Sequence, residues 1–196
     1  DPLPRIEALD AILIDEMIKQ NLPGLAVGVF KNGELVHVGG YGVTDIEDGY
    51  PPVTASTVFR WASISKPLTA VATLQLDEAN NSFSIADKVT EHVPYWTNSP
   101  TSDEAKITIT HLLSNRSGIH HYGNGRDGDD EDTDPDNTYD YFSSKYDTPD
   151  PDGYDAPKAV SVFAGTGIDF TPGDAYLYTT FGFNLLGAAV EEASPN

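Results

Sequence analysis

The chain has 196 residues, enough for one domain with a sizeable hydrophobic core, and its lack of cysteine excludes a disulfide framework and thiolate chemistry. Its formal net charge of −20 would repel nucleic acids and anionic membrane surfaces, so we expect neither as a partner. No run of about eighteen apolar residues occurs, so we expect no membrane span.

The N-terminal part of the chain predicts one helix and one hairpin. Apolar residues recur at helical spacing over residues 5–21 and predict a helix with its apolar stripe facing a sheet. Residues 25–31 and 34–42 are rich in β-branched and apolar side chains and predict two strands. Asn32-Gly33 between them is the preferred two-residue hairpin turn.

The centre of the chain carries Ser63 and, three residues later, Lys66, at the start of a helix predicted to run to about Ala79. A helix places residues three apart on one face, roughly 5–6 Å between Cβ atoms, so the amine can reach the hydroxyl. Unpaired N–H groups at a helix start favour the negative charge of a nucleophile. Apolar residues on most sides predict that this helix is buried. A Ser-x-x-Lys pattern arises by chance about once in a chain of this length, so other segments must support it.

Further elements follow downstream. The patterns predict a short helical segment over residues 83–95 and a helix over 111–115, which Ser117-Gly118 closes. They also predict a helical segment over 158–163, an extended stretch over 176–180 and a final apolar helix over 181–192.

The histidines suggest a metal site, but the pattern favours structural roles. His111, His120 and His121 lie close in sequence, whereas a zinc site needs three or four converging ligands, and two adjacent histidines cannot both face one ion without strain. His37 lies in the second predicted strand, and we expect an ordinary half-exposed strand histidine. We therefore expect no metal and no other cofactor.

Residues 126–155 hold twelve carboxylates and two basic side chains and lack apolar periodicity, which is typical of a long solvated insertion. The spacing of the aspartates suggests calcium. An EF-hand loop starting at Asp127 would need glycine at its sixth position and glutamate at its twelfth, but Asp132 and Thr138 stand there. A flexible charged loop is favoured, and loose calcium binding remains an alternative.

Three separated segments of the chain read FRWASISKPLTAVATLQL, ITITHLLSNRSGIHHY and TPGDAYLYTTFGFNLLGAAVEE. Together, and in this order, they resemble the serine β-lactamase and penicillin-binding-protein superfamily, most closely its class C β-lactamase and D-alanyl-D-alanine carboxypeptidase branch. The resemblance covers nearly the whole chain outside residues 123–157. The threonine at position 180, the long insertion upstream of it and the sequence Ser-Gly-Ile-x-His-Tyr are more similar to the mitochondrial β-lactamase-like serine proteases and their bacterial relatives.

The resemblance implies catalytic roles for three residues. Ser63 would be the acylated nucleophile, and Lys66 would accept or relay its proton. Tyr178 matches the family's tyrosine, whose phenolic oxygen can shuttle the proton to the leaving group. Thr180 falls where most members have asparagine, a ligand of the substrate amide. A hydroxyl there departs from penicillin-type recognition more than from acyl transfer.

The resemblance also implies an α/β fold of the β-lactamase/transpeptidase type, with an antiparallel sheet flanked by helices plus a helical domain. Residues 1–58 would supply the N-terminal helix and first hairpin of the α/β domain. Residues 59–196 would form the helical domain, with the catalytic helix, the acidic insertion and the tyrosine segment. The family's C-terminal strands, with their Lys-Thr-Gly or His-x-Gly strand, are missing from this sequence, so we expect that part of the same protein to be a partner.

The expected function is that of a serine hydrolase that forms an acyl-enzyme at Ser63 and hydrolyses an amide or ester, as a β-lactamase, carboxypeptidase or esterase does. The alternative is a catalytically impaired member that acts as a binding or scaffold protein. The expected partner is a small-molecule or peptide substrate. A secreted, periplasmic or cell-envelope location is expected, with a mitochondrial one as the alternative.

Overall fold

The structure is a computed structural model, and it describes residues 4–47, 49–79, 82–97, 99, 102–121, 156–161 and 163–194. The chain divides into two compact units, Asp1–Arg60 and Trp61–Asn196. The acidic segment 126–155, and with it the calcium hypothesis, lies outside the described residues.

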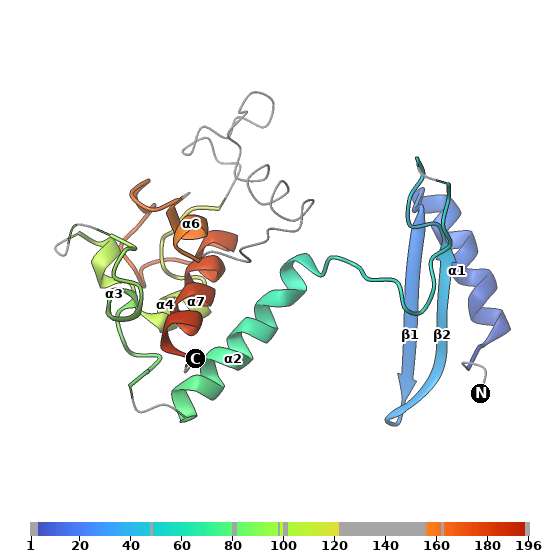
Figure 1. Cartoon of the computed structure of the whole chain (residues 1–196), viewed down its shortest axis with the longest axis horizontal. Helices are drawn as coiled ribbons and strands as arrows, with labels where there is room; N and C mark the ends of the chain where they lie inside the picture. Colours follow the sequence, from blue (N-terminus) through green and yellow to red (C-terminus); the bar gives the residue numbers. More distant parts are fainter. Residues whose placement is uncertain are drawn as a thin grey trace. The chain divides into compact units, whose positions relative to one another are not determined.

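The N-terminal unit consists of the helix α1 (Glu7–Gln20) and an antiparallel hairpin of β1 (Gly24–Lys31) and β2 (Glu34–Gly42). The predicted helix, strands and turn are therefore confirmed, with bounds that differ by at most two residues. Asn32 and Gly33 have φ of +53° and +83°, as a two-residue turn between right-twisted strands requires. In Figure 1, α1 lies alongside the hairpin.

His37 is fully buried, so the expectation of a half-exposed histidine was wrong. Its Nδ1 accepts the N–H of Ile6 at 3.0 Å, and its Nε2 lies 2.8 Å from the hydroxyl of Tyr41. That hydroxyl donates to Asp10 on α1 at 2.5 Å. His37 is covered by a segment that lies 31 residues earlier in the chain, at Ile6. The alternation of polar and apolar residues within the strand does not reveal such a contact.

The C-terminal unit is helical and is built around α7 (Thr180–Ala193), which contacts four other helices. Those are α2 (Ser65–Ala79), α3 (Val89–His92), α4 (Ile109–Leu113) and α6 (Ala156–Ser161), and two 3-10 turns, η1 (Ala62–Ile64) and η2 (Glu104–Lys106), complete the described elements. Glycine and apolar residues dominate α7, and five of its apolar side chains are buried: Phe181, Leu185, Leu186, Ala188 and Ala189. α7 is thus the core helix of this unit, around which the others gather (Figure 1).

Aromatic and branched side chains fill the core between α7 and its neighbours. Phe163 stacks on Phe181 with ring centroids 4.6 Å apart, and Trp96 lies against Phe163 at 5.6 Å. Ile109 and Leu112 of α4 are also fully buried. Because these side chains come from distant parts of the sequence, their packing fixes where the loops around α4 and α7 lie.

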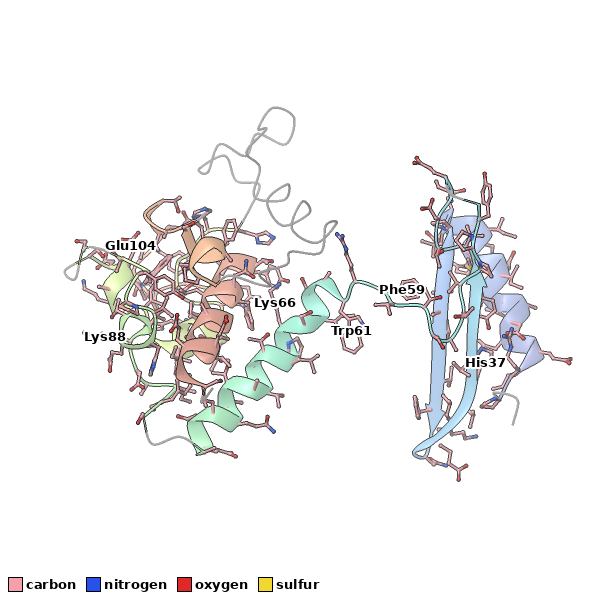
Figure 2. All side chains as sticks on the ribbon, viewed as in Figure 1. His37, Phe59, Trp61, Lys66, Lys88 and Glu104 are labelled. Carbon is pink, nitrogen blue, oxygen red and sulfur yellow. The ribbon has the colours of Figure 1, made fainter. Side chains whose placement is uncertain are left out.

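The helix α2 departs from the expectation that it is buried on most sides. In the described chain, Leu68 and Val71 are 57% and 54% exposed, and Thr73 is the one buried residue of α2. Trp61 and Ile64, just before the helix, are exposed too, and Figure 2 shows Trp61 projecting from the chain. An apolar composition indicates that a helix has a surface suited to packing, but it does not identify the segment that packs against that surface.

The fold class is confirmed as an α/β fold that combines an antiparallel sheet and its helix with a helical part. Among the helices that the structure describes, none has both the length and the apolar character that a membrane crossing requires.

Candidate active site

Ser63 lies in η1, the single 3-10 turn that leads directly into α2. The turn is closed by the N–H of Ile64, which donates to the carbonyl of Trp61 at 3.0 Å. Ala62 adopts φ of +45°, a left-handed conformation that costs a residue with a Cβ about 1–2 kcal/mol. The Ser63 side chain is exposed, so a reacting molecule can approach its oxygen.

Lys66, in the first turn of α2, connects three side chains of the site. Its Nζ donates to Oγ of Ser63 at 3.1 Å and to Oγ1 of Thr180 at 3.1 Å. It also lies 4.8 Å from the centre of the Tyr178 ring, a distance at which a cation is attracted to the ring face. Figure 2 shows Lys66 near the N-terminal end of α2. The ammonium group therefore faces both the hydroxyl and the phenol.

The hydroxyl of Tyr178 donates to Oγ of Ser63 at 2.6 Å, and the side chain is 38% exposed. Burial acts to raise the pKa of this phenol, but its hydrogen bonds with Lys66 and Ser63, the charge of Lys66 and a hydrogen bond with Thr180 outweigh it. The net result is a pKa below the ordinary tyrosine value of 10.0. A phenol of this kind gives up its proton more readily than an ordinary tyrosine, so the phenolate that can act as a base is more accessible near neutral pH.

The main chain on both sides of Tyr178 is held by Asn115, which has φ of +54°. The carbonyl of Asn115 accepts the N–H of Leu177 at 2.9 Å, and its side-chain Oδ1 accepts the N–H of Thr179 at 3.2 Å. The two bonds bracket Tyr178 and leave its side chain free to reach Ser63.

Thr179 caps the N-terminus of α7 and ties it to the loop that follows α4. Its hydroxyl accepts the N–H of Gly182 at 3.2 Å, which satisfies one of the donors that a helix start leaves open. The same hydroxyl donates to the carbonyl of His120 at 2.7 Å. These two bonds connect the loop directly to the first turn of α7.

Sequence reasoning missed Asn115 and His121 as parts of the site. Nδ1 of His121 accepts the N–H of Thr180 at 3.1 Å, and its ring meets the Tyr178 ring edge-on at 5.5 Å. Burial, followed by the charges of Lys66 and His120, lowers the pKa of His121 from the ordinary 6.5. The available signal was that both residues stand in the second segment that carries the family resemblance.

The three histidines considered for a metal do not converge. His111 accepts the N–H of Thr108 with Nδ1 at 3.2 Å, and His120 is buried with its ring edge-on to Phe181. In the part of the chain that the structure describes, no three histidine or carboxylate side chains are placed to hold a metal ion.

The structure thus brings Ser63, Lys66, Tyr178 and Thr180 together, although they come from two distant segments. A hydroxyl, a phenol of lowered pKa and an ammonium lie in mutual contact. This arrangement can move a proton off the serine oxygen and hold the negative charge that results.

The sequence model of the family described as Beta-lactamase matches residues 9–196. Esterase EstB of Burkholderia gladioli is 28% identical over 190 residues, which cover 95% of this chain and 45% of that protein. The mitochondrial serine beta-lactamase-like protein LACTB of Mus musculus is 29% identical over 227 aligned positions, which cover 88% of this chain and 40% of that protein.

A similar fold occurs in a solved structure of a class C beta-lactamase in complex with cefoxitin. The TM-score is 0.66 with 19% identity, and the match covers 95% of this chain and 44% of that one. The chain therefore spans less than half the length of each of these relatives.

Proposed function

This chain belongs to the β-lactamase family, and on that premise we propose that it carries the nucleophilic half of a serine hydrolase that forms an acyl-enzyme at Ser63. The single observation that carries the proposal is the contact of Oγ of Ser63 with both the Tyr178 hydroxyl, at 2.6 Å, and Nζ of Lys66, at 3.1 Å. A serine is a weak nucleophile unless a neighbouring base takes its proton, and this pair provides one.

In the proposed first step, Oγ of Ser63 bonds to the carbonyl carbon of an amide or ester. Its proton passes to the oxygen of Tyr178 in the phenolate form, which the Lys66 ammonium stabilises. The bond from carbon to the leaving nitrogen or oxygen then breaks, and Tyr178 returns the proton to the leaving amine or alcohol. The lowered pKa of Tyr178 supports this assignment of the base.

In the second step, water adds to the acyl carbon and gives one proton to Tyr178. The bond from that carbon to Oγ breaks, the carboxylic acid leaves, and Tyr178 returns the proton to Ser63. Tyr178 therefore acts first as base and then as acid in both halves of the reaction, whereas Ser63 is the nucleophile in the first half and the leaving group in the second. No metal or organic cofactor takes part in this scheme.

The proposed substrates are amides or esters, and the threonine at position 180 favours molecules other than penicillins. A threonine hydroxyl is shorter than the asparagine amide of most family members, and here it accepts a hydrogen bond from Lys66. The esterase among the relatives supports an ester substrate. A secreted, periplasmic or cell-envelope location is part of the same proposal, with a mitochondrial one as the alternative.

The test is covalent labelling of the full-length protein with a fluorophosphonate probe and with a fluorescent penicillin. We expect fluorophosphonate labelling that is abolished in Ser63→Ala and retained in Ser65→Ala, the matched serine two residues away. Labelling that survives in Ser63→Ala would contradict the assigned nucleophile. If neither probe nor an ester panel acylates the wild-type protein, the alternative of a binding or scaffold protein is favoured.

A further inference from the structure

His121 holds the segment that carries Tyr178 and Thr180 in two independent ways. Its Nδ1 accepts the N–H of Thr180 at 3.1 Å, and its ring lies edge-on to the Tyr178 ring at 5.5 Å. The side chain of Thr180 in turn accepts a hydrogen bond from Lys66. A shift of the Thr180 main chain would therefore change the contacts of Lys66 and Tyr178 together.

We propose that His121 is a positioning residue that must be a neutral imidazole, and that its protonation causes a loss of Ser63 acylation at low pH in addition to the loss caused by protonation of the Tyr178 phenolate. The inference rests on the proposed function, since it names a condition for that reaction. His121 does not touch the reacting atoms. It acts through the main chain of Thr180 and the ring of Tyr178.

The chemistry of the imidazole explains the requirement. The nitrogen that faces the N–H of Thr180 must carry a lone pair, so in the neutral ring the proton lies on Nε2. In the protonated ring both nitrogens carry hydrogen, and two donors would then face each other across 3.1 Å. The two N–H groups would repel each other, so the main chain of Thr180 and the protonated ring of His121 would move apart.

The groups facing His121 make protonation unfavourable at neutral pH. Lys66 on α2 is a nearby cation, His120 precedes it in the chain, and Tyr178 packs against its ring. Burial first, then the charges of Lys66 and His120, lower the pKa of His121 below 6.5. The imidazole is therefore neutral at pH 7, and the hydrogen bond to Thr180 fails only as the pH falls below 6.5 and through the lower pKa.

The experiment compares the rate of fluorophosphonate acylation in full-length wild-type, His121→Asn and His121→Leu proteins, across a pH series that runs from above to well below the ordinary histidine pKa of 6.5. Asparagine keeps an acceptor close to the position of Nδ1 but does not titrate. Leucine is similar in size and has no acceptor. The matched control is His111→Asn, since His111 also accepts a main-chain N–H and has a lowered pKa, but contacts none of the four site residues in the described structure.

We expect His121→Leu to be acylated about tenfold more slowly than His121→Asn at pH 7, because the partly buried N–H of Thr180 is left without its acceptor. The low-pH loss of rate seen in the wild type should persist in His111→Asn and be absent or shifted in His121→Asn. Equal rates in the asparagine and leucine variants, or an unchanged low-pH limit in His121→Asn, would overturn the inference.

A second measurement does not depend on activity. In wild-type protein labelled with ¹⁵N-threonine, the amide signal of Thr180, assigned by its loss in Thr180→Ser, should titrate with the protonation of His121 and stop titrating in His121→Asn. An amide that does not titrate in the wild type would contradict the hydrogen bond. This measurement needs no substrate. If Ser63 fails to acylate, the proposed function is rejected, and the amide titration still decides whether His121 holds the main chain of Thr180.

Discussion

The phenolic oxygen of Tyr178 lies 2.6 Å from Oγ of Ser63, although 115 residues separate the two in the chain. The contact is short because two different restraints meet there. The turn η1 presents Ser63 ahead of α2, and Asn115 holds the main chain on either side of Tyr178.

Replacing Tyr178 by phenylalanine should slow turnover by about 10²–10⁴-fold, the usual contribution of a positioned acid–base group. The matched control is Tyr176→Phe, an exposed tyrosine two residues away, which should keep the wild-type rate. An ultraviolet titration of phenolate absorbance should show a tyrosine that ionises below the ordinary pKa of 10.0 in the wild type and in Tyr176→Phe. That ionisation should be absent in Tyr178→Phe. A wild-type rate in this variant would mean that another group carries the proton.

Replacing Lys66 by alanine should abolish measurable acylation, with a loss of at least about 10²-fold, because the variant loses the cation that stabilises the Tyr178 phenolate. Lys106→Ala is the control, since Lys106 forms an exposed pair with Asp103 and should contribute little. The measurement is the rate of fluorophosphonate labelling. Labelling of Lys66→Ala at the rate of Lys106→Ala would remove Lys66 from the mechanism.

Thr180 is the departure from the family pattern that the structure explains best, because its hydroxyl accepts from Nζ of Lys66 at 3.1 Å. Thr180→Val keeps the shape but removes the acceptor, and a hydrogen bond to a charged group contributes about 1.5–3 kcal/mol. We expect acylation to fall about tenfold or more in Thr180→Val and to stay within about threefold of wild type in Thr180→Ser. Equal rates for valine and serine would leave Thr180 as a substrate contact only.

Local patterns predicted the hairpin and the Ser63–Lys66 pair well, because both depend on residues a few positions apart. Asn32-Gly33 adopts positive φ at both residues, as this pair prefers between two strands, and a helical start places Lys66 over Ser63. Tyr178 lies beyond the reach of such patterns. It could be named only from the resemblance of its segment to a known family.

Contacts between distant segments through the main chain were not predictable. Asn115 and His121 act on the N–H groups of residues 177, 179 and 180, and any residue type presents such a group. No pairing of side-chain types therefore marks the contact in the sequence. The burial of His37 escaped prediction for the same reason, since its partner is the N–H of Ile6.

The loop after α4 passes close to a neighbouring main chain at Gly118, which has φ of +81°. A Cβ there would lie 2.4 Å from the carbonyl oxygen of Phe170, and backbone atoms cannot easily give way. Gly118→Ala should therefore destabilise the protein by about 2 kcal/mol or more and lower the melting temperature.

Gly165→Ala is the control for that prediction, because Gly165 has a similar φ of +80° but nothing within 4 Å of its added Cβ. It should cost only the conformational term, about 1 kcal/mol. Thermal unfolding of both variants measures the difference. Equal losses would show that φ alone, and not crowding against Phe170, decides the cost at Gly118.

Asn115 accepts the N–H groups of Leu177 and Thr179, on either side of Tyr178, and this makes position 178 suitable for chemical substitution. Since the neighbours supply the anchoring N–H groups, the phenol can be altered without loosening the peptide that carries it. Fluorinated tyrosines of graded acidity, incorporated at this codon, would give a series in which proton affinity changes and geometry does not. The slope of the logarithm of the acylation rate against the pKa of the phenol would then report the extent of proton transfer in the transition state.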